Sequence, residues 1–408
     1  MSTGAYQPDF PTEMVKEGNV RIIIPRLKAF AKSPSDYAPS RAPVFYNPVM
    51  ELNRDLAVLA VQTYQRTVAH EITICEALAG CGVMGVRFGA EIEGVKGVIM
   101  SDINERAAEL SRENVRLNGL VEKVWVEHDD ANFVLSAHNA PYRRFDVVNI
   151  DPFGSPVPYV DSAIRALRNN GLLALTATDM APLCGVHPKA CTRKYGGRPL
   201  RTEYCHELAV RLLIGSLATA AARHDMGIAV AFSHSSNHYV RSYARVQYGA
   251  KKADESVSNM GYVLHCYDCL HRETRKKAFA DVDSGKCPEC SSRLSFAGPL
   301  WLGEIVDGQF VGNMEEEASK HALRFGRKIA HMMALMRNES NAPVSYYSID
   351  RLCSKLHLPV PPVKLVVDSL KNEGFTACLT HFDPNAVKSD VPAMRIRGLL
   401  QAMAGQNW

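Results

Sequence analysis

The sequence lacks a long hydrophobic run. No apolar stretch among its 408 residues approaches the length of about eighteen that a membrane span needs, and the amino terminus shows no charged-then-apolar signal pattern. Internal repeats and low-complexity segments are absent as well. Because 46% of the residues are hydrophobic, the chain can still bury substantial cores. We therefore expect a cytoplasmic protein of two domains.

Net charge is also small, at +4 with a pI near 8.4. This mean charge is too low to attract a polyanion, so any electropositive face must be local. Four basic stretches are candidates, at residues 21–32, 189–201, 251–252 and 272–277, and the alternative for each is an ordinary solvated surface. Residues 191–198 are the best candidate, because they combine cations, a ring that can stack and flexible glycines, a composition suited to gripping a phosphate backbone.

Eleven cysteines are present, and spacing groups four of them. Cys266 and Cys269 form one Cys-x2-Cys pair and Cys287 and Cys290 the other, with seventeen residues between the pairs. This spacing is typical of a four-thiolate zinc site, which is structural because four thiolates leave no open coordination position. Reduced free thiols or a vestigial site are the alternatives. The other cysteines are expected to be reduced, as in a reducing cytosol.

A carboxylate and an aromatic ring directly follow one strand-like run. Residues 145–150 are apolar and end at Asp151-Pro152-Phe153-Gly154. In open α/β sheets ligands bind at the carboxyl ends of strands. An exocyclic ring amine that attacks a methyl donor needs an acceptor for its N–H and a flat surface for the base, and Asp151 and Phe153 supply these groups. A strand-ending Asp-Pro turn is the alternative if the motif stands alone.

A glycine turn follows an earlier strand-like run. Residues 71–78 read as a buried strand and lead into Gly80-Cys81-Gly82-Val83-Met84-Gly85, a G-x-G-x-x-G turn that opens a helix. Such a turn fits NAD as well as S-adenosylmethionine. The next strand, at 97–100, delivers Asp102 about twenty residues after the glycines, where an acid reaches ribose hydroxyls.

A third strand end carries two acids. Residues 123–127 lead to Asp129-Asp130-Ala131. A side-chain acceptor at this strand end can accept an adenine amino proton, while the next backbone N–H reads the adjacent ring nitrogen. A helix N-cap is the alternative for any one of these acids, but the ordered set of four strand ends favours a ligand site.

The ordered motifs resemble the tRNA (guanine-26-N2) dimethyltransferases of archaea and eukaryotes. The resemblance covers nearly the whole chain, and several of its strings are specific to that family. Besides the four strand ends, it rests on Lys16-Glu17-Gly18, Tyr46-Asn47-Pro48, Asn53-Arg54-Asp55, Thr176-Ala177-Thr178-Asp179, Leu183-Cys184-Gly185, Arg193-Lys194-Tyr195-Gly196, Leu200-Arg201-Thr202-Glu203, Cys205-His206-Glu207, His238-Tyr239-Val240-Arg241, Gly298-Pro299-Leu300-Trp301 and Thr380-His381-Phe382.

The resemblance implies a class I methyltransferase with S-adenosylmethionine as donor and tRNA as partner. One or two methyl groups would pass to N2 of a guanine, guanine 26 by the family's name. By that likeness Arg54 and Asp102 hold the donor, Asp130 and Ala131 lie on its adenine, and Asp151 is the catalytic acceptor. Whether one or two methyls are added is not implied by the residues.

The chain departs from the family at Met84, where an arginine is usual. A polar contact to the donor is therefore missing at that position. Arg87, one helical turn further on, is the candidate replacement.

Alternating strands and helices through residue 248 predict a mainly parallel, doubly wound α/β sheet. The expected architecture is a Rossmann-like methyltransferase domain at 1–250 and a C-terminal α+β domain at 251–408. A polar run at 249–259 is the expected linker. The second domain would hold the zinc segment at 262–294 and a winged-helix-like region at 340–385, where helix, proline turn, helix and strand follow each other.

Three other functions share parts of this pattern. An NAD-dependent oxidoreductase has the glycine turn but leaves residues 151–154 unexplained. An adenine-N6 methyltransferase uses the same amine chemistry. A non-catalytic RNA-binding relative that kept the fold is a third alternative, to which Met84 lends some weight.

Overall fold

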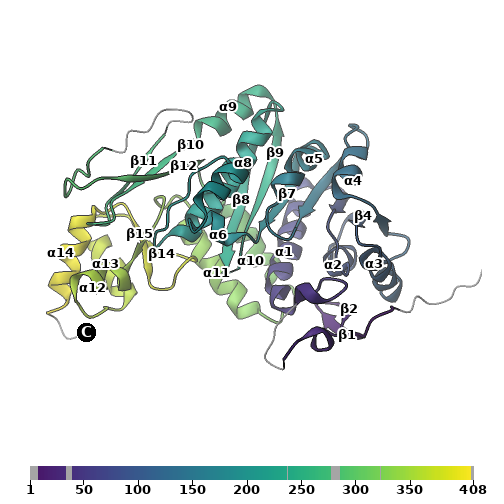
Figure 1. Cartoon of the computed structure of the whole chain (residues 1–408). Helices are drawn as coiled ribbons and strands as arrows, with labels where there is room; N and C mark the ends of the chain where they lie inside the picture. Colours follow the sequence, from purple (N-terminus) through teal and green to yellow (C-terminus); the bar gives the residue numbers. More distant parts are fainter. Residues whose placement is uncertain (1–7, 34–38, 237, 277–284, 322, 406–408) are drawn as a thin grey trace, which may run out of the picture. The chain divides into compact units, whose positions relative to one another are not determined.

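The computed structural model describes residues 8–33, 39–236, 238–276, 285–321 and 323–405. By internal contacts the chain divides into two compact units, each assembled from three segments. The first unit comprises residues 1–151, 159–175 and 313–330, and the second comprises 152–158, 176–312 and 331–408. Each unit thus combines segments that are far apart in the sequence (Figure 1).

The first unit is built on a parallel sheet. Its strands are β3 (Ile72–Glu76), β4 (Val95–Asp102), β5 (Val124–His128), β6 (Phe145–Ile150) and β7 (Leu167–Ala177), whose last two residues belong to the second unit. The strand order is β5-β4-β3-β6-β7, and every neighbouring pair is parallel. All of β6 is buried, as expected for a central strand covered on both faces. The predicted parallel, doubly wound arrangement is confirmed.

Helices and a hairpin surround this sheet. The hairpin of β1 (Thr12–Glu17) and β2 (Val20–Pro25) packs on helix α3 (Glu105–Leu117), where the Asn114 amide binds both the N–H and the C=O of Ile23 at 2.7 and 2.9 Å. Short 3-10 helices lie at η1 (Leu27–Phe30), η2 (Pro39–Arg41) and η3 (Pro48–Met50). The helices here are α1 (Glu51–Val68), α2 (Val83–Glu91), α3 (Glu105–Leu117), α4 (Ala131–Ala137) and α5 (Val157–Arg165).

In the second unit, antiparallel strands pack around a long helix. Helix α8 (Cys205–Ala222) packs against the antiparallel pair β8 (Met226–Ser236) and β9 (Tyr239–Tyr248) and against strand β12 (Ser295–Trp301). Strands β10 (Met260–His265), β11 (Arg272–Arg275) and β12 (Ser295–Trp301) form a sheet of order β11-β10-β12. The remaining helices of this part are α6 (Met180–Leu183), α7 (Pro188–Tyr195) and α9 (Ala250–Ser258).

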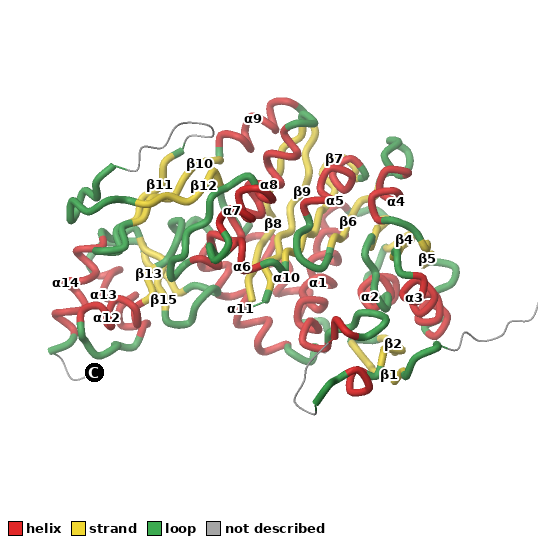
Figure 2. Tube along the Cα trace, viewed as in Figure 1, coloured by secondary structure: helices red, strands yellow, loops and turns green. Residues whose placement is uncertain are grey.

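The carboxyl-terminal part of the second unit has its own core. Strands β13 (Tyr347–Ser348), β14 (Ala377–Leu379) and β15 (Ala386–Ser389) form an antiparallel sheet of order β13-β15-β14. Helices α12 (Ile349–Leu356), α13 (Val363–Asn372) and α14 (Ala393–Met403) group beside it (Figure 2). Leu352, Val366, Leu370 and Ile396 share one buried cluster with Val387 of the sheet, so these elements fold as one layer of helix on sheet.

Several sequence predictions are corrected here. The expected linker at 249–259 is helix α9, which packs on β8 and α8 and whose Ser256 hydroxyl accepts a hydrogen bond from Ile228 N at 2.8 Å. The apolar period of residues 319–337 predicts a helix, which in the structure begins later, as α11 (Gly326–Glu339), after α10 (Gly308–Ala318) has ended.

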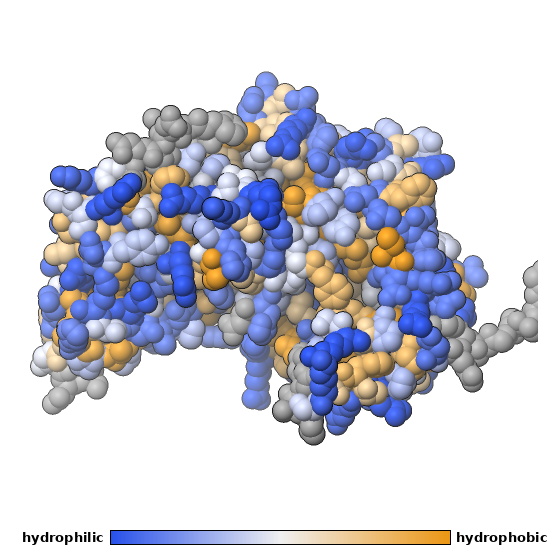
Figure 3. Space-filling model, in the orientation of Figure 1, coloured by the Kyte–Doolittle hydropathy of each residue, from blue (hydrophilic) through white to orange (hydrophobic). Residues whose placement is uncertain are grey.

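One helix does reach the length and hydropathy of a membrane span, contrary to the sequence expectation. This is α8, with a mean hydropathy of 1.2 over eighteen residues, 67% of them buried within the protein. Its Glu207 is fully buried and pairs with Arg211 at 2.8 Å and with Lys388 at 3.0 Å. Helix α8 is therefore the core helix of the second unit. On the face shown in Figure 3, hydrophilic residues are widespread and strongly hydrophobic ones occur in small patches.

Candidate functional site

The glycine turn joins β3 to α2 in the conformation that its spacing predicts. Gly80 and Gly82 have φ of +55° and +78°, and Gly82 is the N-cap of α2. A Cβ on Gly82 would lie 2.7 Å from Ser111 Oγ. A Cβ on Gly85 would overlap the Met100 side chain of β4. The first two glycines thus allow the turn, and the third allows helix and strand to pack closely.

Asp102 ties this turn to the end of β4. Its Oδ2 accepts a hydrogen bond from Gly80 N at 2.8 Å, and its Oδ1 accepts one from Asn104 N at 2.9 Å. Burial raises the pKa of Asp102, an effect that these two N–H groups oppose. The side chain remains partly exposed, so the carboxylate both shapes the turn and faces the carboxyl end of the sheet.

Asp130 is the N-cap of α4. Its Oδ1 accepts hydrogen bonds from Asn132 N at 2.9 Å and from Phe133 N at 3.3 Å. Ala131 is buried at the first position of this helix, where a backbone N–H has no partner within the helix. The helix cap that sequence analysis left as the alternative for Asp130 is therefore present. Asp130 Oδ2 and the backbone N–H of Ala131 are the polar groups left at this helix end for contact with a ligand.

Arg54 belongs to a buried ion network. Its Nε and Nη2 bind the two carboxylate oxygens of Glu17 at 2.5 and 2.6 Å, and its Nη1 and Nη2 both donate to Asn47 O at 3.2 Å. Arg54 is only 6% exposed. Its guanidinium holds the segment before α1 in place, so the geometry favours a positioning role over direct contact with a donor.

Arg87 lies in the same network. It is fully buried and forms ion pairs with Glu17, Asp55 and Glu91 at 3.1, 2.8 and 2.9 Å. The geometry therefore does not favour Arg87 as a replacement for the arginine that the family has at Met84. Sequence analysis missed this network, because Glu17 and Arg87 are seventy residues apart.

The Asp-Pro-Phe-Gly turn follows β6 directly. Asp151 comes immediately after the buried strand, and the Phe153 ring is 69% exposed. Gly154, with φ of +84°, exchanges two hydrogen bonds with Thr178 at the end of β7: Gly154 N donates to Thr178 Oγ1 at 2.6 Å and Thr178 N donates to Gly154 O at 2.8 Å. Thr178, the first residue after β7, therefore lies beside this turn.

Asp179 connects the same region to helix α7. Its carboxylate accepts a hydrogen bond from Tyr195 Oη and forms an ion pair with Lys194 Nζ at 2.8 Å. The Tyr195 hydroxyl also interacts with Ser155, next to Gly154. Helix α7, which sequence analysis treated only as a basic stretch, is thus anchored to both turns through Tyr195.

A basic cavity of about 690 Å³ opens beside α7 in the second unit. Lys189, Arg193, Arg198 and Arg201 line it, and the ring of Tyr267 adds an aromatic surface. These four cations are exposed, whereas Lys194 is paired with Asp179. The predicted basic stretch at 189–201 is therefore a concave surface of one charge sign.

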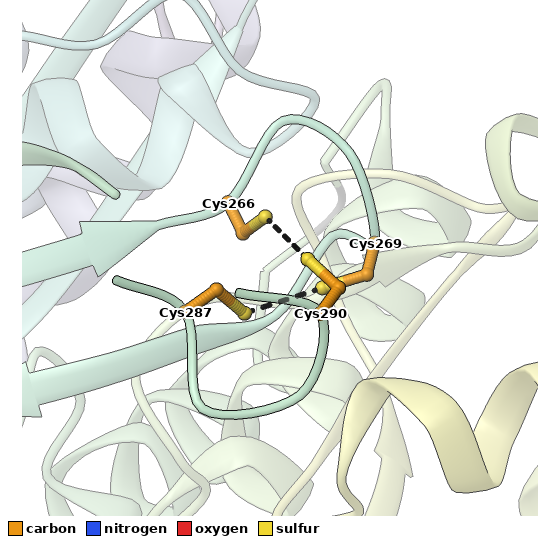
Figure 4. Close-up of side chains that lie close together, drawn as sticks. All are labelled: Cys266, Cys269, Cys287 and Cys290. Atoms are coloured by element: carbon orange, nitrogen blue, oxygen red, sulfur yellow. Dashed lines mark hydrogen bonds between the residues drawn. The ribbon is translucent and has the colours of Figure 1, made fainter. Parts of the chain in front are cut away.

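The four spaced cysteines meet at one point (Figure 4). Their Sγ atoms all lie within 4.8 Å of one another, and the pairs Cys266–Cys290 and Cys269–Cys287 are 3.4 and 3.5 Å apart. These distances exceed a disulfide bond and approach the roughly 3.8 Å edge of a tetrahedral zinc–thiolate site with bonds of about 2.3 Å.

The backbone around these cysteines repeats itself. Leu270 N donates to Cys266 O and Ser291 N donates to Cys287 O, both at 2.9 Å. Leu270 and Ser291, each one residue after the second cysteine of its pair, have φ of +66° and +62°. Two equivalent turns thus point four thiols inward, and this donor set fits Zn²⁺.

Of His234, His238 and His265, whose residue type suggests a base or a metal site, two have structural roles. Burial lowers the pKa of His265 to about 3 and that of His234 well below its usual range, so both are neutral. His265 Nδ1 lies 3.0 Å from Tyr204 Oη in the core of the second unit. His238 differs, since it is exposed.

Four successive strand ends define the class of this protein. They carry the glycine turn after β3, the acids after β4 and β5, and the aromatic turn after β6. The fold is that of a Rossmann-like α/β protein, and these residues lie at the carboxyl ends of its parallel strands, where ligands bind in proteins of this class.

Comparison with known proteins makes the class specific. A family model described as N2,N2-dimethylguanosine tRNA methyltransferase matches residues 18–401. The tRNA (guanine(26)-N(2))-dimethyltransferases of Methanobrevibacter smithii and Methanothermobacter thermautotrophicus are 40% and 41% identical to this chain, over 98% and 95% of it and 100% and 98% of their own lengths. The chain therefore belongs to the N2,N2-dimethylguanosine tRNA methyltransferase family, as the resemblance predicted.

A solved structure has the same fold. Trm1 from Pyrococcus horikoshii in complex with S-adenosyl-L-methionine matches with a TM-score of 0.82 and 31% sequence identity, covering 94% of this chain and 98% of that one. The predicted Rossmann-like class is confirmed. Family membership also favours S-adenosylmethionine over NAD as the ligand of the glycine turn.

Proposed function

We propose that this protein transfers one or two methyl groups from S-adenosylmethionine to the exocyclic N2 of a guanine in tRNA. The observation that carries the proposal is the turn Asp151-Pro152-Phe153-Gly154 at the end of β6, next to β3 with its glycine turn. The names of the relatives supply guanine 26 as the position and a dimethylated product.

The donor is held at the ends of β3, β4 and β5. Gly80 and Gly82 let the backbone approach it, Asp102 accepts hydrogen bonds from its ribose, and Asp130 with the N–H of Ala131 reads its adenine. S-adenosylmethionine supplies an activated methyl group on a sulfonium. Arg54 acts at a distance, because its hydrogen bonds to Asn47 O fix the segment that leads into α1.

Asp151 and Phe153 serve the acceptor. The guanine leaves its stack and lies against Phe153, whose exposed ring offers the flat surface. Asp151 would accept an N2 proton as the amine nitrogen bonds to the methyl carbon and the carbon–sulfur bond breaks, which leaves S-adenosylhomocysteine. Thr178 hydrogen-bonds both the N–H and the C=O of Gly154 and so fixes the turn that carries the Phe153 ring. Positioning accounts for most of the rate, since the methyl group is already activated.

The basic cavity beside α7 is where we place a tRNA phosphate contact. Lys189, Arg193, Arg198 and Arg201 concentrate positive charge that the mean charge of +4 does not provide. Tyr195 connects α7 to Asp179 and Ser155, which links this surface to the acceptor turn. A phosphate held there would orient the RNA relative to Phe153.

The other sequence predictions remain part of the proposal. The four-cysteine cluster would hold a structural Zn²⁺. The order β13, α12, α13, β14, β15 supports a winged-helix-like module within residues 340–385. A functional division into a methyltransferase domain at 1–250 and a C-terminal domain at 251–408, and a cytoplasmic location, follow from the same assignment.

The decisive experiment measures transfer of a labelled methyl group from S-adenosylmethionine to unmodified tRNA. Digestion of the product should place the label in N2-methylated or N2,N2-dimethylated guanosine. Label in N6-methyladenosine would instead identify an adenine methyltransferase. Binding of tRNA and S-adenosylmethionine without transfer would identify a non-catalytic relative.

A further inference from the structure

A second cluster of metal-binding side chains lies in the second unit, apart from the four spaced cysteines. Cys184, Cys205 and His206 each place one ligand atom within 4.8 Å of the others. The two thiols are close enough for an S–H···S hydrogen bond and are not joined as a disulfide. All three side chains are only partly buried, so an ion can reach them.

The backbone holds these three residues at two helix ends. Cys184 is the C-cap of α6, and its N–H donates to Met180 O at 2.7 Å. Cys205 is the first residue of α8, directly before His206. Because both positions belong to regular elements packed in the unit, the three ligand atoms are held together without any ion.

A hydrogen-bond chain sets the imidazole in the form that a metal requires. His206 Nδ1 lies 3.1 Å from Ser235 Oγ, and Ser235 Oγ donates to Ser236 O at 3.2 Å. The hydroxyl proton is thereby used, so Ser235 Oγ accepts the proton of Nδ1. The lone pair of the ring is then on Nε2, and the Nδ1 hydrogen bond is the outer support that metal-bound histidines usually have.

We propose that Cys184, Cys205 and His206 form a second zinc site, with water in the fourth position. Two thiolates and one imidazole suit Zn²⁺, a borderline-soft ion that takes sulfur and nitrogen ligands at about 2.3 and 2.0 Å. Binding requires both thiols to lose their protons, so uptake releases protons to solvent.

The position of the site in the chain gives the ion a role. Cys184 and Cys205 flank residues 185–204. This segment carries all four cations of the basic cavity. Gly185 already approaches the other end of this segment, since a Cβ there would lie 2.8 Å from Arg201 N. The zinc ion would close the base of this segment and so fix the basic cavity. This role, unlike the metal site itself, rests on the proposed tRNA contact.

Metal analysis of the full-length protein tests the site. We expect two zinc ions per chain in the wild type, and one in the double variant Cys184→Ser with Cys205→Ser. Cys378→Ser, which removes a partly buried cysteine outside both clusters, should retain two. A wild type with a single zinc ion that the double variant also retains would overturn the proposal, as would a disulfide between Cys184 and Cys205 in the freshly purified protein.

A second measurement does not depend on the variants folding. Chelator-treated wild-type protein is titrated with Co²⁺, and the thiolate-to-cobalt absorption should saturate at two ions per chain with bands from two different ligand sets. His206→Ala should remove the band of the two-thiolate site only. Saturation at one ion, or a wild-type spectrum in His206→Ala, would contradict the assignment.

The role of the ion has a separate readout. Amide hydrogen exchange of residues 185–204 should accelerate in the double variant, while helix α8, which follows this segment, should stay protected. An unchanged exchange rate would show that the ion does not hold this segment. Neither result depends on methyl transfer, so failure of the metal site and failure of the proposed function are distinguishable.

Discussion

Asp102 shows how a single side chain serves both the fold and the site. Its two oxygens bind Gly80 N and Asn104 N, so the acid that would face a ribose also fixes the glycine turn. Sequence spacing predicted where Asp102 lies, because strand ends and glycine turns are local patterns. It did not predict that Arg54 would bind Glu17, because that partner is thirty-seven residues away and only the fold brings the two together.

At the scale of the residue, replacing Asp151 with alanine should abolish methyl transfer. Loss of a proton acceptor in the transition state should reduce kcat by about two to four orders of magnitude. Affinity for S-adenosylmethionine, measured by calorimetry, should stay within a few-fold of wild type. The exposed Asp254→Ala in α9 is the control and should be fully active. More than a tenth of wild-type activity in Asp151→Ala would disprove its assigned role.

Gly85→Ala should destabilise the first unit. The added methyl group would overlap the Met100 side chain, and overpacking of this kind costs about 1–3 kcal/mol. Gly398→Ala in α14 is the matched control, because its Cβ would meet no atom within 4 Å and alanine favours a helix by about 0.5–1 kcal/mol. Urea unfolding measures both. Equal stability of the two variants would show that the close packing of α2 on β4 is not required.

At the scale of the element, the clearest successes were those with a regular pattern or a strong stop signal. Strand β6 has the bounds predicted at 145–150, and helix α12 has those that the sequence predicts at 349–356, ahead of the prolines at 359–362. Helix α9 was missed because its composition is polar and charged, although Ala253 and Ser256 form a small buried face on β8. The four cysteines were predicted as a group because ligand spacing is a local signal, whereas Cys184 and Cys205 have no such spacing.

The two cysteine turns after β10 lead to a prediction about this element. Cys266→Ser combined with Cys287→Ser should lose one zinc ion per chain and lower the melting temperature, because binding energy at a structural site is also folding energy. Affinity for tRNA should fall more than affinity for S-adenosylmethionine. A double variant that kept its full metal content and melting temperature would show that these turns hold no zinc.

At the scale of the whole molecule, surface charge should govern RNA binding through the cavity beside α7. Replacing Lys189, Arg193 and Arg201 with alanine removes up to three phosphate contacts and should reduce the slope of log affinity against log salt by roughly 2. Lys251, Lys364 and Lys371, exposed elsewhere in the second unit, form a control triple with the same change in charge. If both triples changed the slope equally, only overall charge would matter.

Stability should fall in acid because of a buried carboxylate. Burial by itself would raise the pKa of Glu339, but His381 at 2.7 Å and Lys388 at 3.3 Å lower it to about 2. A folded-state pKa below the unfolded value of 4.5 stabilises the protein above pH 4.5, and this stabilisation is lost as the pH falls from 4.5 toward 2.

Urea unfolding at a series of pH values measures this effect. Glu339→Gln should be less stable than wild type near neutral pH but should lose less stability on acidification. The exposed Glu304→Gln should keep the wild-type pH dependence. Parallel curves for Glu339→Gln and wild type would assign the acid sensitivity to other groups.

The assembly of each unit from three segments has a consequence for synthesis. The first unit requires residues 313–330 to be complete, although its sheet ends at residue 175. Most of the second unit must therefore leave the ribosome before the first unit can finish folding. Strands β3 to β7 are synthesised long before the helical residues 313–330 that complete their unit. Domains that are contiguous in sequence fold in order as they emerge. Here folding would be concerted and nearly post-translational, so a chain truncated before residue 313 should be prone to aggregate.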